Sequence, residues 1–204
     1  MTLHKSLATA LKDRENVSQL KVSVKGSSFP AELLDFPQLT ELYLEGECTT
    51  LPENLEGFKT LKVLSIKWPA FKGDLSLLFS LPQLENLKII ETPMKRFLLP
   101  LGRVTAPLRL LTIKSCGLEA LPEEVSMLTR LYELSLPNNL LSKLPFSFSE
   151  LLDLRRLNLD SNNFEQFPDV IRKMQKLSHL SFDANKFPEL ERERIQREFN
   201  IWVS

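Results

Sequence analysis

Apolar residues in this chain recur with a period of 22 to 24 residues, and within each period they follow the same order. Residues one, four and six of each unit are apolar, and most of the residues between them are polar. Position four is Leu in every unit. The first positions of the eight units are Val17, Leu39, Leu61, Leu84, Leu108, Leu131, Leu154 and Leu177. Such self-similarity at a fixed period predicts a stack of repeated structural units.

Positions four and six are two residues apart, so they point to the same face of a short strand. The alternation stops after position six, which predicts that each strand ends there. Later in most units an apolar residue precedes Pro, as at Leu121-Pro122, Leu144-Pro145 and Phe167-Pro168. Proline fixes its own φ and lacks a backbone donor, which suits a turn into a short returning segment.

Position nine is Asn in the last three units, at Asn139, Asn162 and Asn185. An Asn amide both accepts and donates hydrogen bonds, so these residues predict a ladder that holds neighbouring turns in register. The first five units carry other residues there, namely Lys25, Glu47, Pro69, Thr92 and Cys116. The third and fourth units also lack the apolar-Pro pair, so we expect locally irregular backbone between Trp68 and Pro107.

The pattern LxxLxLxxNxL followed by LPxxI/L resembles the leucine-rich repeat (LRR), and the resemblance covers residues 17–187. It implies an α/β solenoid, with a parallel concave sheet of about eight to nine short strands and short helical or 3₁₀ segments on the convex side. The units are similar to those of short bacterial LRR proteins and of Ras-suppressor-like intracellular LRR proteins. That similarity implies an interaction role in signalling or in contact with a host.

The two ends of the chain are predicted to cap the stack within one structural domain. Leu3, Leu7 and Leu11 recur every four residues, which predicts a capping helix within residues 1–16. Residues 17–187 form the repeats. Residues 188–204 are predicted to form a second cap, with a helix after Pro188 and a short strand at 201–203.

Charge and composition narrow the function. The chain has 26 basic and 26 acidic residues, which disfavours nucleic acid as a partner. No apolar run is long enough to span a membrane, and no secretory leader is evident, so a cytoplasmic location is expected, with signal-independent secretion as the alternative. No Gly-rich phosphate loop is present, and the two histidines and two cysteines are far apart in the repeats. No cofactor or metal is therefore predicted, and a monomer is favoured.

One group of residues matches catalytic chemistry in composition. His179 and Ser181 alternate on one strand, and Asp160 falls on the strand before it. A catalytic Ser needs its base within about 3 Å, whereas residues two apart on a strand face are about 7 Å apart. We therefore predict a non-enzymatic protein and keep a hydrolase at these residues as a minor alternative.

Positions three, five and seven are predicted to point away from the core, and we call the sheet face that they form the concave face. Units two to five place large apolar residues there, with Trp68 just beyond these positions and lysines around them, which is typical of an interaction site. The alternatives are that these side chains pack on one another, or that the chain self-associates through an edge strand or its convex face. The predicted residues for binding a protein or peptide partner are Tyr43, Val63, Lys67, Trp68, Lys88, Ile90, Leu110 and Lys114.

Overall fold

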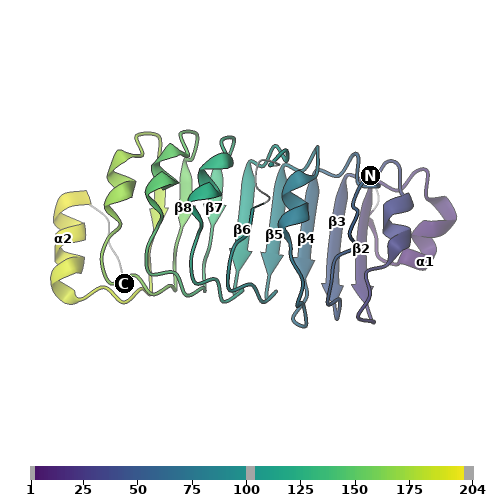
Figure 1. The fold of residues 1–204 in the computed structure, drawn as a ribbon, viewed down its shortest axis with the longest axis horizontal. Coiled ribbons are helices and arrows are strands. Elements are labelled where there is room, and N and C mark those ends of the chain that lie inside the picture. Colours follow the sequence, from purple (N-terminus) through teal and green to yellow (C-terminus); the bar gives the residue numbers. More distant parts are fainter. Residues whose placement is uncertain (1–2, 100–103, 200–204) are drawn as a thin grey trace. The chain divides into compact units, whose positions relative to one another are not determined.

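The computed structural model describes residues 3–99 and 104–199 of the 204-residue chain. Contacts between Cα atoms divide the chain into two compact units, each containing several of the sequence repeats, and these are called the first and the second unit below. The first comprises Met1–Pro93 and Leu98–Arg109, and the second comprises Met94–Phe97 and Leu110–Ser204. In each unit the strands follow one another in chain order, and helical turns lie over one side of the strands (Figure 1). That the whole chain acts as one structural domain stays a prediction.

Parallel strands in register form the sheet of the first unit. Leu20, Leu42, Leu64 and Leu87, all at position four, are paired across successive strands. The strands are β1 (Leu3–His4), β2 (Gln19–Val24), β3 (Glu41–Gly46), β4 (Val63–Lys67) and β5 (Asn86–Ile90). The helical elements are α1 (Leu7–Ala10), η1 (Leu11–Asp13), η2 (Ala31–Asp35) and η3 (Ser76–Ser80).

The second unit repeats the arrangement with shorter strands. Leu111, Leu134, Leu157 and Leu180 are paired in the same register. The strands are β6 (Leu110–Lys114), β7 (Glu133–Ser135), β8 (Arg156–Asn158) and β9 (His179–Ser181). The helical elements are η4 (Glu123–Met127), η5 (Phe146–Glu150), η6 (Asp169–Lys173) and α2 (Glu189–Phe199).

The apolar columns of the sequence form the core. The residues at positions four and six are buried in every repeat except at Leu180, which is half-buried on the last strand of the sheet. Within 68–107, β5 and η3 are regular elements. The described residues between 91 and 109 contain no named helix or strand, and this is the part where the expectation holds.

The strands do not all end where the sequence predicts. β2 and β3 continue past position six to Val24 and Gly46, both at position eight. β7, β8 and β9 stop already at position five. In repeats four to eight, position eight is a non-glycine residue with left-handed φ, a conformation that changes the direction of the chain after the strand. These residues are Glu91, Ser115, Asn138, Ser161 and Ala184, with φ between 45° and 61°.

The two ends differ in part from the expectation. Leu3 lies in strand β1 and pairs with Gln19, so the single helix face through Leu3, Leu7 and Leu11 is wrong. The chain forms only one α-helical turn at Leu7–Ala10, followed by the 3₁₀ turn η1. At the other end, α2 is helical as predicted. The predicted strand at 201–203 lies outside the described residues.

Candidate binding surface

The side chains of Asn139, Asn162 and Asn185 join successive turns of the second unit. Asn139 Oδ1 accepts hydrogen bonds from the Cys116 and Leu118 backbone N–H groups, at 3.1 and 3.2 Å. Its Nδ2 donates to the Ile113 carbonyl of the preceding strand region at 2.8 Å. Asn162 and Asn185 make equivalent bonds, and all three residues are buried. The ladder predicted at position nine is therefore present, and it joins the turns that carry β6 to β9.

Trp68, one of the predicted partner-binding residues, is fully buried, so its placement on the exposed face is wrong. Its ring stacks on Phe71 with centroids 5.6 Å apart, and meets Phe29 edge-on at 6.4 Å. Its backbone N–H donates to Thr92 Oγ1 at 3.0 Å, the kind of bond that the position-nine N–H of Cys116 makes to Asn139. Trp68 is at position eight of the third repeat and does not have a left-handed φ. Its side chain therefore turns inward at position eight, one residue before the position-nine side chains of repeats four to eight.

The concave face of the first unit carries the apolar residues that the sequence predicts there. Strand register places Tyr43, Ser65 and Lys88 in one row across β3, β4 and β5. Val63 precedes Ser65 on the same face of β4, and Ile90 follows Lys88 on the same face of β5. Tyr43, Val63 and Ile90 are half-buried, and Lys88 is exposed. Ser65 is the smallest side chain of this row, and from its size relative to its neighbours we infer a shallow hollow at this residue.

Hydrogen bonds and ion pairs already hold several polar groups on this face. Tyr43 donates its phenol hydrogen to Glu41 Oε2 at 2.9 Å, and burial together with this carboxylate raises the pKa of Tyr43. Two ion pairs join neighbouring strands or their ends, Lys21 to Glu45 and Lys67 to Glu91, each at 2.8 Å.

Lys88 differs from these lysines. In the described part of the chain no ion pair involves it, and its side chain is exposed in the middle of the row. Its charge is therefore free to interact with a ligand.

A groove of about 580 Å³ lies where β3 and β4 end. Its walls combine both charges with apolar surface, from Glu45, Gly46, Glu47, Lys67, Pro69 and Ala70. The groove shares Lys67 with the predicted partner-binding residues, so the concave face of this unit continues into a hollow at the strand ends.

Leu110 and Lys114, the last two predicted partner-binding residues, belong to the second unit. They lie on β6 at positions three and seven, where Leu110 is half-buried and Lys114 is exposed. The structure thus brings Tyr43, Val63, Lys67, Lys88 and Ile90 together on one unit and places this pair on the other.

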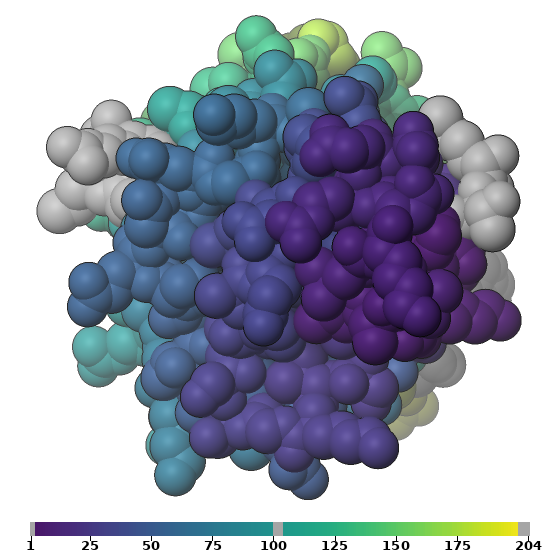
Figure 2. Space-filling model, turned by 90° about the vertical axis from the view of Figure 1, so that its right-hand side faces the viewer, coloured from purple at the N-terminus to yellow at the C-terminus, as the bar shows by residue number. Residues whose placement is uncertain are grey.

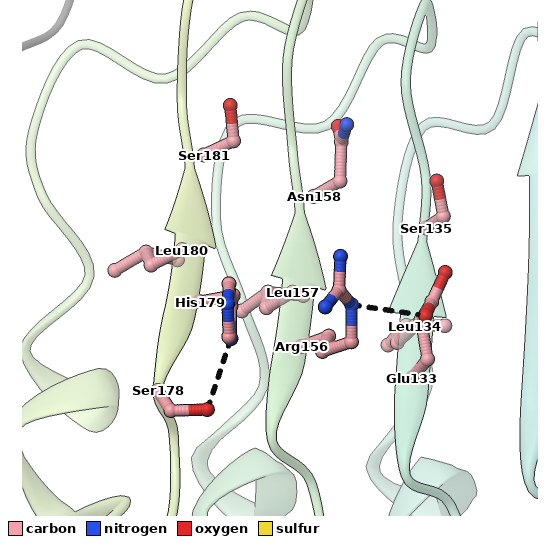
Figure 3. A pocket seen from close by; sticks show the side chains of 10 residues that line it. All are labelled: Glu133, Leu134, Ser135, Arg156, Leu157, Asn158, Ser178, His179, Leu180 and Ser181. Atoms are coloured by element: carbon pink, nitrogen blue, oxygen red, sulfur yellow. Dashed lines mark hydrogen bonds and ion pairs between the residues drawn. The ribbon is translucent and has the colours of Figure 1, made fainter.

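The concave face of the second unit is polar. A groove of about 510 Å³ runs over β7, β8 and β9. Figure 3 shows Arg156 in the middle strand, between Glu133 and His179 of the strands on either side. Arg156 Nε is 3.1 Å from Glu133 Oε2, and Ser178 Oγ is 3.0 Å from His179 Nδ1.

The catalytic alternative is not assembled in the described residues. Ser181 donates its hydroxyl hydrogen to Asp160 Oδ1 at 2.5 Å, and the Asp183 backbone N–H donates to the same oxygen at 2.8 Å. His179 is instead hydrogen-bonded to Ser178, so the imidazole is not placed against the Ser181 hydroxyl. These contacts fit a hydrogen-bonded sheet surface.

The remaining reactive side chains are enclosed. Cys48 and Cys116 are free thiols and both are buried. Burial raises the pKa of the Cys48 thiol, which disfavours its reactive thiolate. In the residues that the structure describes, no His, Cys, Asp and Glu side chains gather as a metal site would require. No helix within this part of the chain is long and apolar enough to cross a membrane.

The sequence interpretation missed Ser65 and Glu41 as parts of the candidate surface. Both follow from the repeat itself, because Ser65 is at position five and Glu41 at position three. Lining up equal positions of successive units places Ser65 between Tyr43 and Lys88. The signal was therefore in the register, which places a small residue between two larger ones.

Comparison with known proteins identifies the fold. No protein-family model matches the sequence, and no curated protein matches it significantly. Solved structures do match. An LRR protein of Leptospira interrogans aligns at a TM-score of 0.58 and 19% identity, over 94% of this chain and 62% of that one.

Two further structures agree. A chain from the Toll–Spatzle complex of Drosophila aligns at a TM-score of 0.70 and 25% identity, over 91% of this chain and 26% of that one. InlP of Listeria monocytogenes aligns at 0.63 and 20%, over 83% of this chain and 49% of that one. This chain thus spans less than two thirds of the length of each of these three chains. Parallel strands in chain order, together with these matches, identify it as a leucine-rich-repeat protein by fold.

Proposed function

We propose that the chain is a non-enzymatic interaction module that binds a protein or peptide on its concave face, centred on the depression at Ser65. The observation that carries the proposal is the group of half-exposed apolar side chains Tyr43, Val63 and Ile90 around this small residue. Aromatic and aliphatic side chains in a shallow hollow are typical anchors of protein interfaces. Lys88 adds a charge that no acidic partner within the described structure neutralises.

The surroundings of this hollow support an extended ligand that follows the concave face of the first unit. Lys67 and the groove at the ends of β3 and β4 adjoin the hollow on the first unit. Leu110 and Lys114 offer a similar pairing of apolar surface and positive charge on the second unit. One structural neighbour comes from the Toll–Spatzle complex, a structure of two proteins bound together. A role in signalling or in contact with a host is part of this proposal.

The proposal is tested by affinity purification with two matched double variants. Lys88→Glu with Ile90→Glu changes the hollow, and Lys59→Glu with Leu77→Glu makes the same chemical changes at exposed positions elsewhere on the first unit. A partner enriched on the wild-type protein is then purified, and its affinity for all three proteins is measured by calorimetry. We expect a loss of at least about tenfold, near 1.4 kcal/mol, for the concave variant only.

Circular dichroism and thermal unfolding must first show that both double variants are folded. The proposal is wrong if a partner binds the concave variant and the wild-type protein equally well. Sedimentation of the isolated chain separates the main alternative, because self-association through another face would give an oligomer that the concave variant leaves intact.

A further inference from the structure

Strand β1 covers only the beginning of β2. Its two residues pair with Gln19 and Leu20, whereas β2 continues to Val24. The chain then leaves the sheet and forms α1 from Leu7. Among the residues that the structure describes, no backbone hydrogen bond joins Ser23 to the segment 5–13. The second half of β2 is therefore an open sheet edge.

The direction of the backbone groups shows which residues offer hydrogen bonds at this edge. Glu41 N–H donates to the Ser18 carbonyl at 3.0 Å, and Glu47 N–H donates to the Val24 carbonyl at 3.1 Å. The even-numbered residues of β2 thus turn their backbone groups toward β3. Because these groups alternate along a strand, those of Gln19, Lys21 and Ser23 face away from β3. The pairing of His4 with Leu20 uses Gln19 and Lys21, so the backbone groups of Ser23 face the open edge. An unpaired edge of this kind is a template for another strand.

A groove of about 710 Å³ lies alongside this edge. Its lining includes Val22 and Val24 of β2, Leu7 and Ala8 of α1, and Phe29 from the turn after β2. Figure 2 looks onto this end of the first unit, with the N-terminal residues in purple. Val22 and Val24 are each 6% exposed, so the groove has an apolar floor beside the unpaired backbone.

The charges at the groove favour a negatively charged ligand. Lys5 and Lys25 both line the groove and are exposed, and neither takes part in an ion pair within the described structure. Glu32 supplies one opposing charge in the lining. The other lysine of this edge, Lys21, is already paired with Glu45 on the concave face.

We propose that this edge binds an extended segment of a partner protein, in which apolar and acidic residues alternate, as an added strand parallel to β2. β1 shows that the edge already accepts a parallel strand at Gln19 and Leu20. The three uncovered residues, Val22 to Val24, give room for about 10 Å of extended chain. Apolar side chains of the segment face Val22 and Val24, and acidic ones lie near Lys25. This edge site is separate from the concave face and independent of the function proposed for it.

The first test is amide hydrogen exchange on the intact chain. The probe is an acetylated, amidated hexapeptide of alternating valine and glutamate. In the free protein we expect the Ser23 amide to exchange much faster than the amides of β3. Saturating peptide should slow the Ser23 amide by at least about tenfold, because it gains a hydrogen-bonded partner. The same peptide with alternate backbone amides methylated should have no effect.

Variants then test the two sources of recognition. Ser23→Pro removes an N–H group that faces the edge and leaves the bonds between β2 and β3 in place, so peptide affinity should fall at least about tenfold. Lys25→Glu should weaken binding by about threefold to tenfold, since it reverses an exposed charge at the groove. Lys59→Glu, a charge reversal at an exposed lysine outside the groove, should leave affinity unchanged.

Three results would overturn the proposal. The edge is not open if the Ser23 amide of the free monomer is as protected as the amides of β3. No strand is added if millimolar peptide fails to slow exchange of this amide. A second copy of the chain, rather than a partner strand, occupies the edge if protection rises with protein concentration in the absence of peptide.

Discussion

The two units hold their successive turns together in different ways. The second unit has strands of only three residues at β7, β8 and β9, and buried Asn side chains join its turns. The first unit has strands of five or six residues at β2 to β5, and no Asn at position nine. In the first unit, longer runs of backbone hydrogen bonds between strands thus join successive turns. In the second unit, side-chain amides of Asn join them.

The backbone at position eight also differs between the repeats. A left-handed residue such as Asn138 or Ser161 follows the end of β7 or β8 by three residues and turns the next side chain inward. In the first unit Val24 continues the strand, and Gly46 permits a φ of 127° where a Cβ would lie 2.0 Å from the Val24 carbonyl oxygen. Longer strands give the first unit a broader sheet face for the candidate binding surface.

The largest effect on stability is expected at Trp68, an apolar side chain buried in the unit that lacks the Asn ladder. Trp68→Ala removes a fully buried ring that packs on Phe71 and Phe29, so the free energy of unfolding should fall by about 3–5 kcal/mol. Urea unfolding followed by circular dichroism measures the change. Leu77→Ala, at a residue that is 38% exposed, is the control and should cost far less. Equal effects of the two substitutions would show that Trp68 does not anchor the unit.

A somewhat smaller effect is expected from the ladder of the second unit. Asn162→Ala removes the acceptor of the Leu141 N–H and the donor to the Leu136 and Leu159 carbonyls. Since these buried groups lose their partner, unfolding should become easier by about 3 kcal/mol. Hydrogen exchange should show faster opening in the second unit than in the first. Uniform acceleration across both units would contradict the division of roles described above.

Thr92 is the position-nine residue that bonds the backbone of the buried Trp68. Replacing it should lower stability by less than replacing Asn162. Its hydroxyl accepts the Trp68 N–H and donates to the Ile90 carbonyl, both at 3.0 Å. Thr92→Val keeps the volume but leaves these groups unpaired, so the loss should be about 1–2 kcal/mol. Thr92→Ser keeps the hydroxyl and is the matched control, measured in the same urea titration. A Val variant as stable as wild type would show that the hydroxyl is dispensable.

The sequence predicts those features that depend on repeated positions. The apolar columns, the Asn ladder and the phase of β5 follow from residue spacing, because each unit buries the same positions. The orientation of Trp68 does not, since it depends on the missing left-handed turn rather than on the residue type. The open edge of β2 was equally hidden, because the length of β1 is set by where α1 begins. Among the predicted surface residues, exposure followed the column positions, and Trp68 failed because it lies beyond them.

The smallest effect on stability is expected at an exposed contact of the second unit, and this effect should depend on pH. In the second unit the Glu123 carboxylate accepts the Phe146 and Ser147 backbone N–H groups at the start of η5, and these bonds lower the pKa of Glu123. A carboxylate whose pKa is lower in the folded state stabilises the fold above its unfolded pKa, and this contribution is lost as pH falls through the folded value. Glu123→Gln should therefore lower stability at pH 7 and flatten its decline below about pH 4.5. Urea midpoints from pH 7 to pH 3 measure this, with exposed Glu119→Gln as the control. Parallel pH profiles for wild type and Glu123→Gln would show that the bonds across neighbouring turns add nothing to the stability of the second unit.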